Sequence, residues 1–377
     1  MAAGVCRHFG VCGGCDWQDV PYDEQLRRKR AGLQRLLDDA LGPKRACPIS
    51  DVTGHPGPAP TEMGQALFPA GFRRKAAFVF APVPGAHPRR RAVVPFVFGH
   101  YARGSRDVVP IAECPVHAPR ANRLAFALAA RLAHAGVPAA GPRLDGVLRH
   151  LIVRTTEGER EAMAMLVVTR NDRALRAPIR AWLAADDKPT GFFLNINDRP
   201  GSTMVGAETI KIDGRAQVRE TVAGFSFLLS PTAFFQTNPA AAATLVALVT
   251  EAAGDTPLSV LDLYAGSGLF AIPLAARGHR VTAVESSRAA VDDGRRNVGL
   301  NRLPDDRVRY VTAPVEAALP RLGRQPYDLV VLDPPRDGCT PAVLEGVFQD
   351  LRPTRAIYVS CAPESLARDL PSIVDAG

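Results

Sequence analysis

Four apolar segments in the last third of the sequence limit its fold more than any other feature. Each is apolar on both faces, and each is separated from the next by a segment long enough for a helix. Strands of this kind are typical of parallel sheets that helices cover on both sides. The pattern therefore predicts an α/β fold with a Rossmann-like, doubly wound sheet. The segments are SVLDLYAG at 259–266, HRVTAVESS at 279–287, YDLVVLDPPR at 327–336 and AIYVSCAP at 356–363.

The earlier part of the chain follows another pattern and predicts an α+β region. Residues 21–41 place leucines on one side and basic residues on the other, as an amphipathic helix does. A chain of 377 residues suits two domains, and we place them at 1–215 and 216–377. Within them we expect strands at 75–82, 92–101, 147–156 and 161–170, helices at 121–136 and 238–254, and a Pro/Gly-rich loop at 48–70.

Charge and composition favour some partners over others. The net charge is +8, which favours a polyanion such as a nucleic acid, although basic runs at 26–35, 71–76 and 87–92 suit a solvated surface equally well. The sequence contains no apolar run of about 18 residues, and its start does not resemble a signal peptide. We therefore expect a soluble cytoplasmic protein with reduced thiols and no membrane partner.

The carboxyl ends of the predicted strands carry residues suited to an adenosine-containing ligand. Ligands of doubly wound sheets bind outside these ends. Gly266 and Gly268 follow the first strand, where they allow a tight turn and a close approach of the backbone. Glu285 ends the second strand and can accept hydrogen bonds from ribose hydroxyls. These residues are compatible with NAD, FAD or S-adenosyl-L-methionine (SAM).

The third and fourth strands favour SAM and the methylation of a base. The third ends in Asp-Pro-Pro from Asp333, which is not a feature of dehydrogenases but matches methyltransferases that act on bases. Cys361 follows the fourth strand just before a predicted helix, whose N-terminal end favours a thiolate. We interpret Cys361 as a nucleophile and Cys339 as a loop cysteine. Thiolate addition at C6 of a pyrimidine would let C5 attack a methyl donor.

The chain resembles the SAM-dependent RNA uracil-5-methyltransferases over almost its whole length. This family includes enzymes that act on tRNA and on ribosomal RNA, and the resemblance implies a class I methyltransferase sheet preceded by a smaller α+β domain. It is carried by several motifs in the same order. They are C-x5-C-G-G-C-x2-Q at 6–18, FRRK at 72–75, GHYARGSRDVVPIAECP at 99–115, NINDRPGSTMVG at 195–206, SPTAFFQTNP at 230–239, LDLYAGSGLF at 261–270, DPPRDG at 333–338 and YVSCAPESLARDL at 358–370.

The resemblance implies roles for individual residues. Cys361 is the nucleophile that forms a covalent adduct with C6 of uracil, and Gln236 contacts the methyl donor together with Tyr264, Glu285 and Asp333. It also implies that Cys6, Cys12, Cys15 and Cys114 hold a [4Fe–4S] cluster with a structural or RNA-positioning role. From spacing alone, a zinc ion bound by four cysteines fits nearly as well.

The layout of the chain is nearest to the RlmC type of ribosomal RNA enzyme, because no barrel domain precedes the cysteine motif. That favours 23S ribosomal RNA of the large subunit over tRNA. The sequence does not imply an obligate protein partner. In the family, further strands and a catalytic base glutamate follow the nucleophile helix, whereas 16 residues follow Cys361 here. We therefore expect the C-terminal strands and the base to be missing. The alternatives are a catalytically impaired RNA-binding protein with a metal-stabilised fold, a tRNA enzyme, a methyltransferase of an exocyclic amine, and a cytosine-5 enzyme.

Overall fold

The structure is a computed structural model that describes residues 6–42, 47–55, 69–83, 95–201, 203–322 and 326–376. The chain forms two compact units. The first unit comprises Met1–Pro21, Gly57–Glu220 and Thr237–Pro239, and the second comprises Tyr22–Pro56, Thr221–Gln236 and Ala240–Gly377. No helix in the described ranges has the length and apolar character that crossing a bilayer requires.

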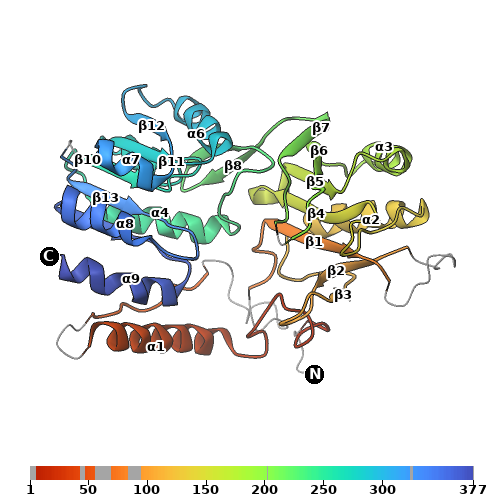
Figure 1. Ribbon diagram of the computed structural model, residues 1–377, viewed down its shortest axis with the longest axis horizontal. Helices are drawn as coiled ribbons and strands as arrows, with labels where there is room; N and C mark the ends of the chain where they lie inside the picture. The colour runs from red at the N-terminus through yellow and green to blue at the C-terminus, as the bar shows by residue number, and fades with distance from the viewer. Residues whose placement is uncertain are drawn as a thin grey trace. The chain divides into compact units, whose positions relative to one another are not determined.

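The first unit contains a seven-stranded mixed sheet in the order β3-β2-β1-β4-β5-β6-β7 (Figure 1). Its pairs are antiparallel except for β5 and β6, which are parallel. The strands are β1 (Lys75–Ala81), β2 (Val97–Tyr101), β3 (Val108–Pro110), β4 (Leu148–Thr155), β5 (Ala162–Val168), β6 (Gly191–Ile196) and β7 (Glu208–Gly214).

Two helices build the core of this unit with the sheet. Helix α2 (Pro119–His134) begins with a proline in its first turn, where a missing N–H is harmless, and buries Leu124 and Leu128. Helix α3 (Arg176–Leu183) buries Trp182, which packs edge-on against Phe192 of β6. Phe78 of β1 belongs to the same apolar cluster. The predicted helix at 121–136 is thus confirmed, and the short 3₁₀ turns Glu157–Glu159 and Arg173–Leu175 complete the unit's helical segments in the described ranges.

The second unit contains a five-stranded parallel sheet in the order β12-β11-β10-β13-β14. The strands are β10 (Ser259–Leu263), β11 (Arg280–Glu285), β12 (Val308–Thr312), β13 (Leu329–Leu332) and β14 (Arg355–Tyr358). Strand order reverses between β10 and β13, as in a doubly wound fold. The predicted parallel sheet is confirmed, with β12 as a fifth strand that we did not predict. Two further strands, β8 (Val218–Val222) and β9 (Phe225–Leu229), pair with each other.

Helices accompany the parallel strands along the chain (Figure 1). The predicted helices at 238–254 and 21–41 are confirmed as α4 (Pro239–Ala253) and α1 (Tyr22–Leu41). Although α1 comes early in the chain, it packs on α9 in the second unit. The remaining helices are α5 (Ala271–Ala276), α6 (Arg288–Leu300), α7 (Val315–Leu322), α8 (Pro341–Glu345), a π-helical turn at Gly346–Leu351, and α9 (Pro363–Asp375).

The N-terminal strand predictions hold with small changes of boundary. The predicted strands at 75–82, 147–156 and 161–170 correspond to β1, β4 and β5. Of the predicted strand at 92–101, residues 97–101 form β2, and residues 92–94 lie outside the described residues. Of the predicted loop at 48–70, residues 48–55 and 69–70 have no helix or strand, and residues 56–68 lie outside the described residues.

Candidate functional site

The register of the parallel sheet brings the predicted site residues to one edge. Leu263 at the end of β10 pairs with Val284 of β11 and with Leu332 of β13. Leu332 in turn pairs with Tyr358, the last residue of β14. The residues that follow these strand ends therefore emerge side by side at the carboxyl edge of the sheet. They include Tyr264, Glu285, Asp333 and Cys361.

The glycine turn after β10 adopts a backbone that few other residues could follow. Gly268 has a φ of +96°, and a Cβ there would lie 2.6 Å from the Tyr310 hydroxyl. Gly266 has a φ of +55° and open space around its Cα, as a turn that admits a ligand requires. Tyr264, a non-glycine residue, has a φ of +63°. Strain of this kind costs roughly 1–3 kcal/mol and concentrates at functional sites.

Glu285 closes the turn through hydrogen bonds. Its Oε2 accepts from the backbone N–H of Gly266 at 3.0 Å, and its Oε1 accepts from the backbone N–H of Ser287 at 2.7 Å. Oε1 also accepts a hydrogen bond from Ser286 Oγ at 3.3 Å, so Oε2 is the oxygen that can accept a further one, because a carboxylate offers about four acceptor positions. Glu285 is partly exposed, so hydroxyl donors of a ligand can reach it.

Two further carboxyl groups lie close to this turn. Burial raises the pKa of Asp333 from its ordinary value to about 6. Asp262 in β10 is completely buried, and burial together with the charge of Asp333 raises its pKa well above the usual range. Asp262 is a site residue that the sequence patterns did not predict. The sequence signal for Asp262 was an acidic residue inside the apolar segment SVLDLYAG. Burial of a carboxyl group in such a strand is energetically unfavourable, so its presence there points to a specific role.

The structure separates the two candidate cysteines. Cys361 is exposed, two residues before the start of α9. The residues around it turn tightly, because Ser360 Oγ accepts a hydrogen bond from the backbone N–H of Ala362 at 3.2 Å. Cys339 is buried, and burial raises the pKa of its thiol to about 11. A neutral buried thiol is a poor nucleophile, so the geometry favours Cys361 over Cys339.

Gln236 lies between β9 and α4, in the second unit, and is partly buried. Two residues earlier, Phe234 exposes 68% of its surface, which is unusual for a phenylalanine. Phe234 has no role predicted from the sequence, although it lies in the SPTAFFQTNP motif. The sequence signal for an exposed ring was the pair of adjacent phenylalanines before Gln236. In the structure Phe235 is buried, whereas Phe234 is exposed.

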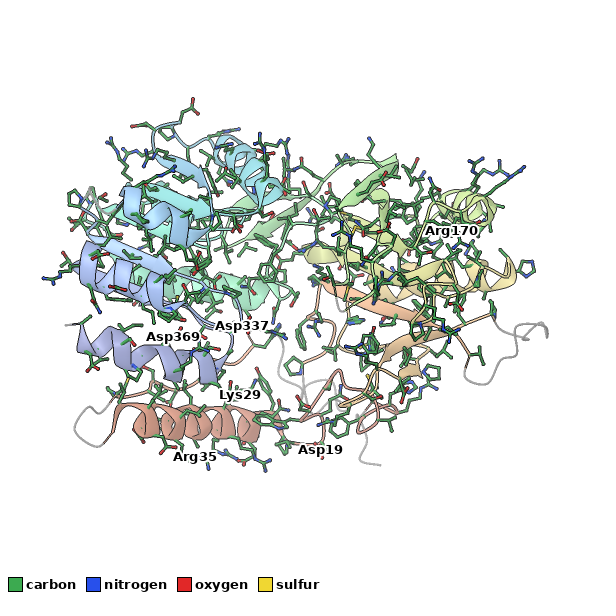
Figure 2. All side chains as sticks on the ribbon, in the orientation of Figure 1. Asp19, Lys29, Arg35, Arg170, Asp337 and Asp369 are labelled. Atoms are coloured by element: carbon green, nitrogen blue, oxygen red, sulfur yellow. The ribbon has the colours of Figure 1, made fainter. Side chains whose placement is uncertain are left out.

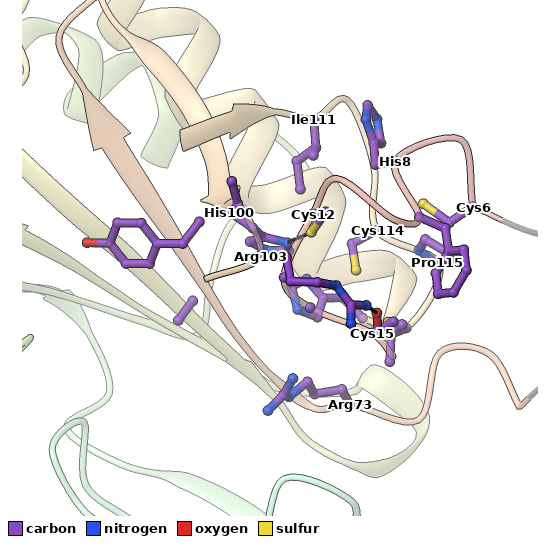
Figure 3. Close-up of a pocket in the computed structure, with 18 of the residues that line it drawn as sticks. Cys6, His8, Cys12, Cys15, Arg73, His100, Arg103, Ile111, Cys114 and Pro115 are labelled. Atoms are coloured by element: carbon purple, nitrogen blue, oxygen red, sulfur yellow. Dashed lines mark hydrogen bonds between the residues drawn. The ribbon is translucent and has the colours of Figure 1, made fainter. Parts of the chain in front are cut away.

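The four cysteines predicted as cluster ligands line one cavity of the first unit (Figure 3). The cavity has a volume of about 500 Å³ and is also lined by Arg73 and His100. Gln18, which is 5% exposed, accepts a hydrogen bond from the Cys6 backbone N–H at 3.1 Å and donates one to Cys15 Sγ at 3.0 Å. The cysteines are Cys6, Cys12, Cys15 and Cys114.

This cavity does not present a ready site for a single metal ion. In the parts of the chain that the structure describes, no three His, Cys, Asp or Glu side chains are grouped closely enough to hold one. Burial raises the pKa of Cys15 above its ordinary value and that of Cys114 to about 11. Burial also lowers the pKa of His100 to about 4, so this imidazole is neutral at pH 7.

Comparison with known proteins supports the arrangement of the second unit. The family model of the tRNA (uracil-5-)-methyltransferases matches residues 183–376. An RNA methyltransferase of Gloeobacter violaceus, described as uncharacterized, is 33% identical over 97% of this chain and 75% of its own length. A counterpart from Thermosynechococcus vestitus is 34% identical over 97% of this chain and 76% of its own length.

A solved structure shares the whole fold. The crystal structure of the Pyrococcus abyssi tRNA (uracil-54, C5)-methyltransferase in complex with S-adenosyl-L-homocysteine superposes with a TM-score of 0.73. The match covers 97% of this chain and 80% of the other at 24% identity, so it establishes the architecture alone. The family match over residues 183–376 and the near full-length relatives lead to one assignment. The chain belongs to the SAM-dependent RNA uracil-5-methyltransferase family.

Proposed function

We propose that this chain transfers a methyl group from SAM to C5 of a uridine in 23S ribosomal RNA, with Cys361 as nucleophile. One observation carries the proposal. An exposed cysteine follows β14 at the sheet edge where Glu285 ends β11 and Asp333 follows β13. The reaction requires a thiolate, a methyl donor and a uracil to lie close together. A nucleophile and a donor site at the same edge of one sheet are placed for this.

The chemistry follows from the electronic structure of uracil. The Cys361 thiolate adds to C6 and forms a C–S bond, and the electron pair of the C5–C6 double bond moves to the enolate. SAM would supply an electrophilic methyl group, which C5 of the adduct takes as the S–CH3 bond breaks and S-adenosyl-L-homocysteine leaves. Removal of the C5 proton by a base expels the thiolate and restores the double bond. The uracil must be unpaired or flipped out of its helix to reach Cys361 in such a site.

The donor site fits the second unit's own residues. The open Cα of Gly266 permits close approach of a ligand to the turn, and Glu285 retains acceptor capacity for ribose hydroxyls. Asp333, Tyr264 and Gln236 complete the set that we assign to donor binding, with Gly268 shaping the turn. The Asp333 carboxylate suits the cationic sulfonium end of SAM.

The cysteine cavity of the first unit is the proposed site of a [4Fe–4S] cluster. In such a cluster four thiolates serve as ligands. The resemblance of the motif at 6–18 to the family supports this ligand set, and the four cysteines line one cavity. We propose that Cys6, Cys12, Cys15 and Cys114 hold the cluster, which ties the N-terminal segment to the loop after β3 and takes no part in methyl transfer.

The choice of RNA has two candidates. The cysteine motif at 6–18 resembles that of ribosomal RNA members, which supports 23S ribosomal RNA. The family model and the Pyrococcus abyssi protein carry tRNA in their names, which supports tRNA as the second candidate. The net charge of +8 suits either polyanion.

The test uses transcripts of both RNAs and SAM labelled in its methyl group, under anaerobic conditions. Nucleoside analysis of digested 23S ribosomal RNA should show labelled 5-methyluridine with the parent chain and with Cys339→Ala, but not with Cys361→Ala. Label on the tRNA transcript alone would mean that tRNA, and not 23S ribosomal RNA, is the substrate. Label in an exocyclic amine, or label that survives in Cys361→Ala, would overturn the mechanism. RNA binding without label or adduct would support the non-catalytic alternative.

A further inference from the structure

A single buried carboxylate joins three segments around the candidate nucleophile. Asp369 on α9 is 2% exposed. Its Oδ2 accepts a hydrogen bond from the Cys339 backbone N–H at 2.8 Å and another from the Tyr358 hydroxyl at 2.6 Å. Tyr358 ends β14, three residues before Cys361, and Cys339 closes the loop that begins at Asp333.

Neighbouring contacts hold the same loop against α9. Ser365 Oγ donates a hydrogen bond to the Arg336 carbonyl at 2.5 Å, and the Arg368 guanidinium donates to the Asp337 carbonyl. Figure 2 labels Asp369 on α9 and Asp337 in this loop. Gly338 has a φ of +74°, and a Cβ there would lie 2.5 Å from Asp369 Oδ2, so the loop backbone and the carboxylate are in direct apposition.

Burying a carboxylate is unfavourable unless hydrogen bonds compensate it, so a core that needed only packing would place an apolar residue here. Oδ2 accepts from two donors of different segments, while Oδ1, among the described residues, is bonded by Arg368 alone, whose side chain is 57% exposed. The two Oδ2 bonds therefore define the relative placement of the strand end, the helix and the loop.

We propose that Asp369 is a positioning residue that fixes the Cys361 segment against the Asp333 loop, and so sets the distance between the nucleophile and the methyl donor. The inference rests on the proposed function, because it takes Cys361 as the nucleophile and Asp333 as part of the donor site. A displacement of about 1 Å between reacting groups can slow a reaction about 100-fold.

Substitutions at Asp369 separate positioning from charge. Asp369→Ala removes both Oδ2 bonds. Asp369→Asn keeps a carbonyl oxygen that can accept both, and its amide group replaces only Oδ1. Tyr358→Phe removes the bond to Oδ2, together with the hydrogen bond between the Tyr358 hydroxyl and the Cys339 thiol, and leaves the carboxylate in place. His279→Ala serves as the structural control, since His279 is fully buried, bonds to Leu258 N–H at 3.2 Å and precedes β11 at the opposite edge of the sheet.

The readout is the rate of adduct formation on 23S ribosomal RNA and tRNA transcripts made with 5-fluorouridine, with SAM. Fluorine at C5 cannot leave as a proton does, so the methylated adduct persists whichever residue acts as the base. We expect Asp369→Ala to slow the adduct about 100-fold and Tyr358→Phe about 10-fold, with the Kd for SAM within threefold of the parent. Asp369→Asn should recover most of the lost rate, and His279→Ala should match the parent.

Amide hydrogen exchange gives a second readout that needs no RNA. Exchange of residues 359–366 and 334–339 should accelerate in Asp369→Ala and Tyr358→Phe but not in Asp369→Asn or His279→Ala. Parental exchange and adduct rates in Tyr358→Phe, or equal slowing by His279→Ala, would overturn the inference. Tyr358→Phe decides the question if Asp369→Ala does not fold. An adduct that persists in Cys361→Ala would instead overturn the proposed function.

Discussion

The backbone N–H of Gly266 donates a hydrogen bond of 3.0 Å to Oε2 of Glu285 and so joins the ends of the neighbouring parallel strands β10 and β11. One side chain thus holds the glycine turn in shape and presents its remaining acceptor positions to a ligand. A cofactor site built in this way is pre-organised, since the acid does not have to move when the ligand arrives.

Replacing Glu285 should weaken the donor site. Hydrogen bonds to charged groups contribute about 1.5–3 kcal/mol, so Glu285→Ala should raise the Kd for SAM roughly 10- to 100-fold. Titration calorimetry with SAM measures the change. Asp292→Ala is the control, because Asp292 is a partly exposed acid on α6 whose ion pair with Arg295 spans 3.8 Å. Equal SAM affinity in the parent and in Glu285→Ala would remove Glu285 from the site.

Gly268 and Gly278 form a matched pair for the glycine turn. Both have a φ of +96°, but a Cβ at Gly268 would lie 2.6 Å from the Tyr310 hydroxyl, whereas nothing lies within 4 Å of one at Gly278. Gly268→Ala should therefore lower the free energy of unfolding by roughly 1–3 kcal/mol more than Gly278→Ala does. Urea unfolding of both variants tests this. Equal losses would mean that backbone strain alone, without the contact to Tyr310, requires a glycine at 268.

Asp333 should make stability depend on pH. Burial raises its folded-state pKa from 3.8 to about 6, so its favourable contribution is complete below the unfolded pKa and is lost as the pH rises through about 6. Asp333→Asn escapes that loss and should be more stable than the parent by roughly 1–3 kcal/mol at pH 7.5. The difference should shrink toward pH 4. Urea unfolding across this range would refute the account if the difference were independent of pH.

Gln18 should protect the proposed cluster. It bridges the Cys6 backbone N–H and Cys15 Sγ, and hydrogen-bond partners of metal ligands typically change metal affinity 10- to 100-fold. After anaerobic reconstitution, Gln18→Leu should lose its iron to a chelator about 10-fold faster than the parent, as followed by visible absorbance. Gln34→Leu, which alters a glutamine of α1, should behave as the parent. Failure of the parent to bind iron would remove the cluster from the account.

The sequence predicted the sheet and its functional edge because both depend on local patterns. Strands that are apolar on both faces indicate parallel pairing, and parallel register then places Asp333 and Glu285 at one edge without further information. The β12 segment escaped prediction because Arg309 interrupts its short apolar run. The packing of α1 on α9 escaped because it joins segments far apart in the sequence.

The hydrogen bonds of Asp369 could not be predicted for a related reason. They depend on the path of the loop from Asp333 to Cys339, and that path is set by the turn at Gly338 rather than by any periodicity. Burial of Cys339 and exposure of Cys361 are likewise tertiary properties. Sequence position placed both cysteines near the same edge, and the structure then distinguished them by burial.

The most direct test of the central claim is the transfer of label from methyl-labelled SAM to RNA by the parent chain and by Cys361→Ala. The account predicts labelled 5-methyluridine in 23S ribosomal RNA with the parent, and neither this product nor a covalent RNA adduct with Cys361→Ala. Label at the same position in both proteins would contradict it, because the reaction would then proceed without the nucleophile on which the proposed mechanism depends.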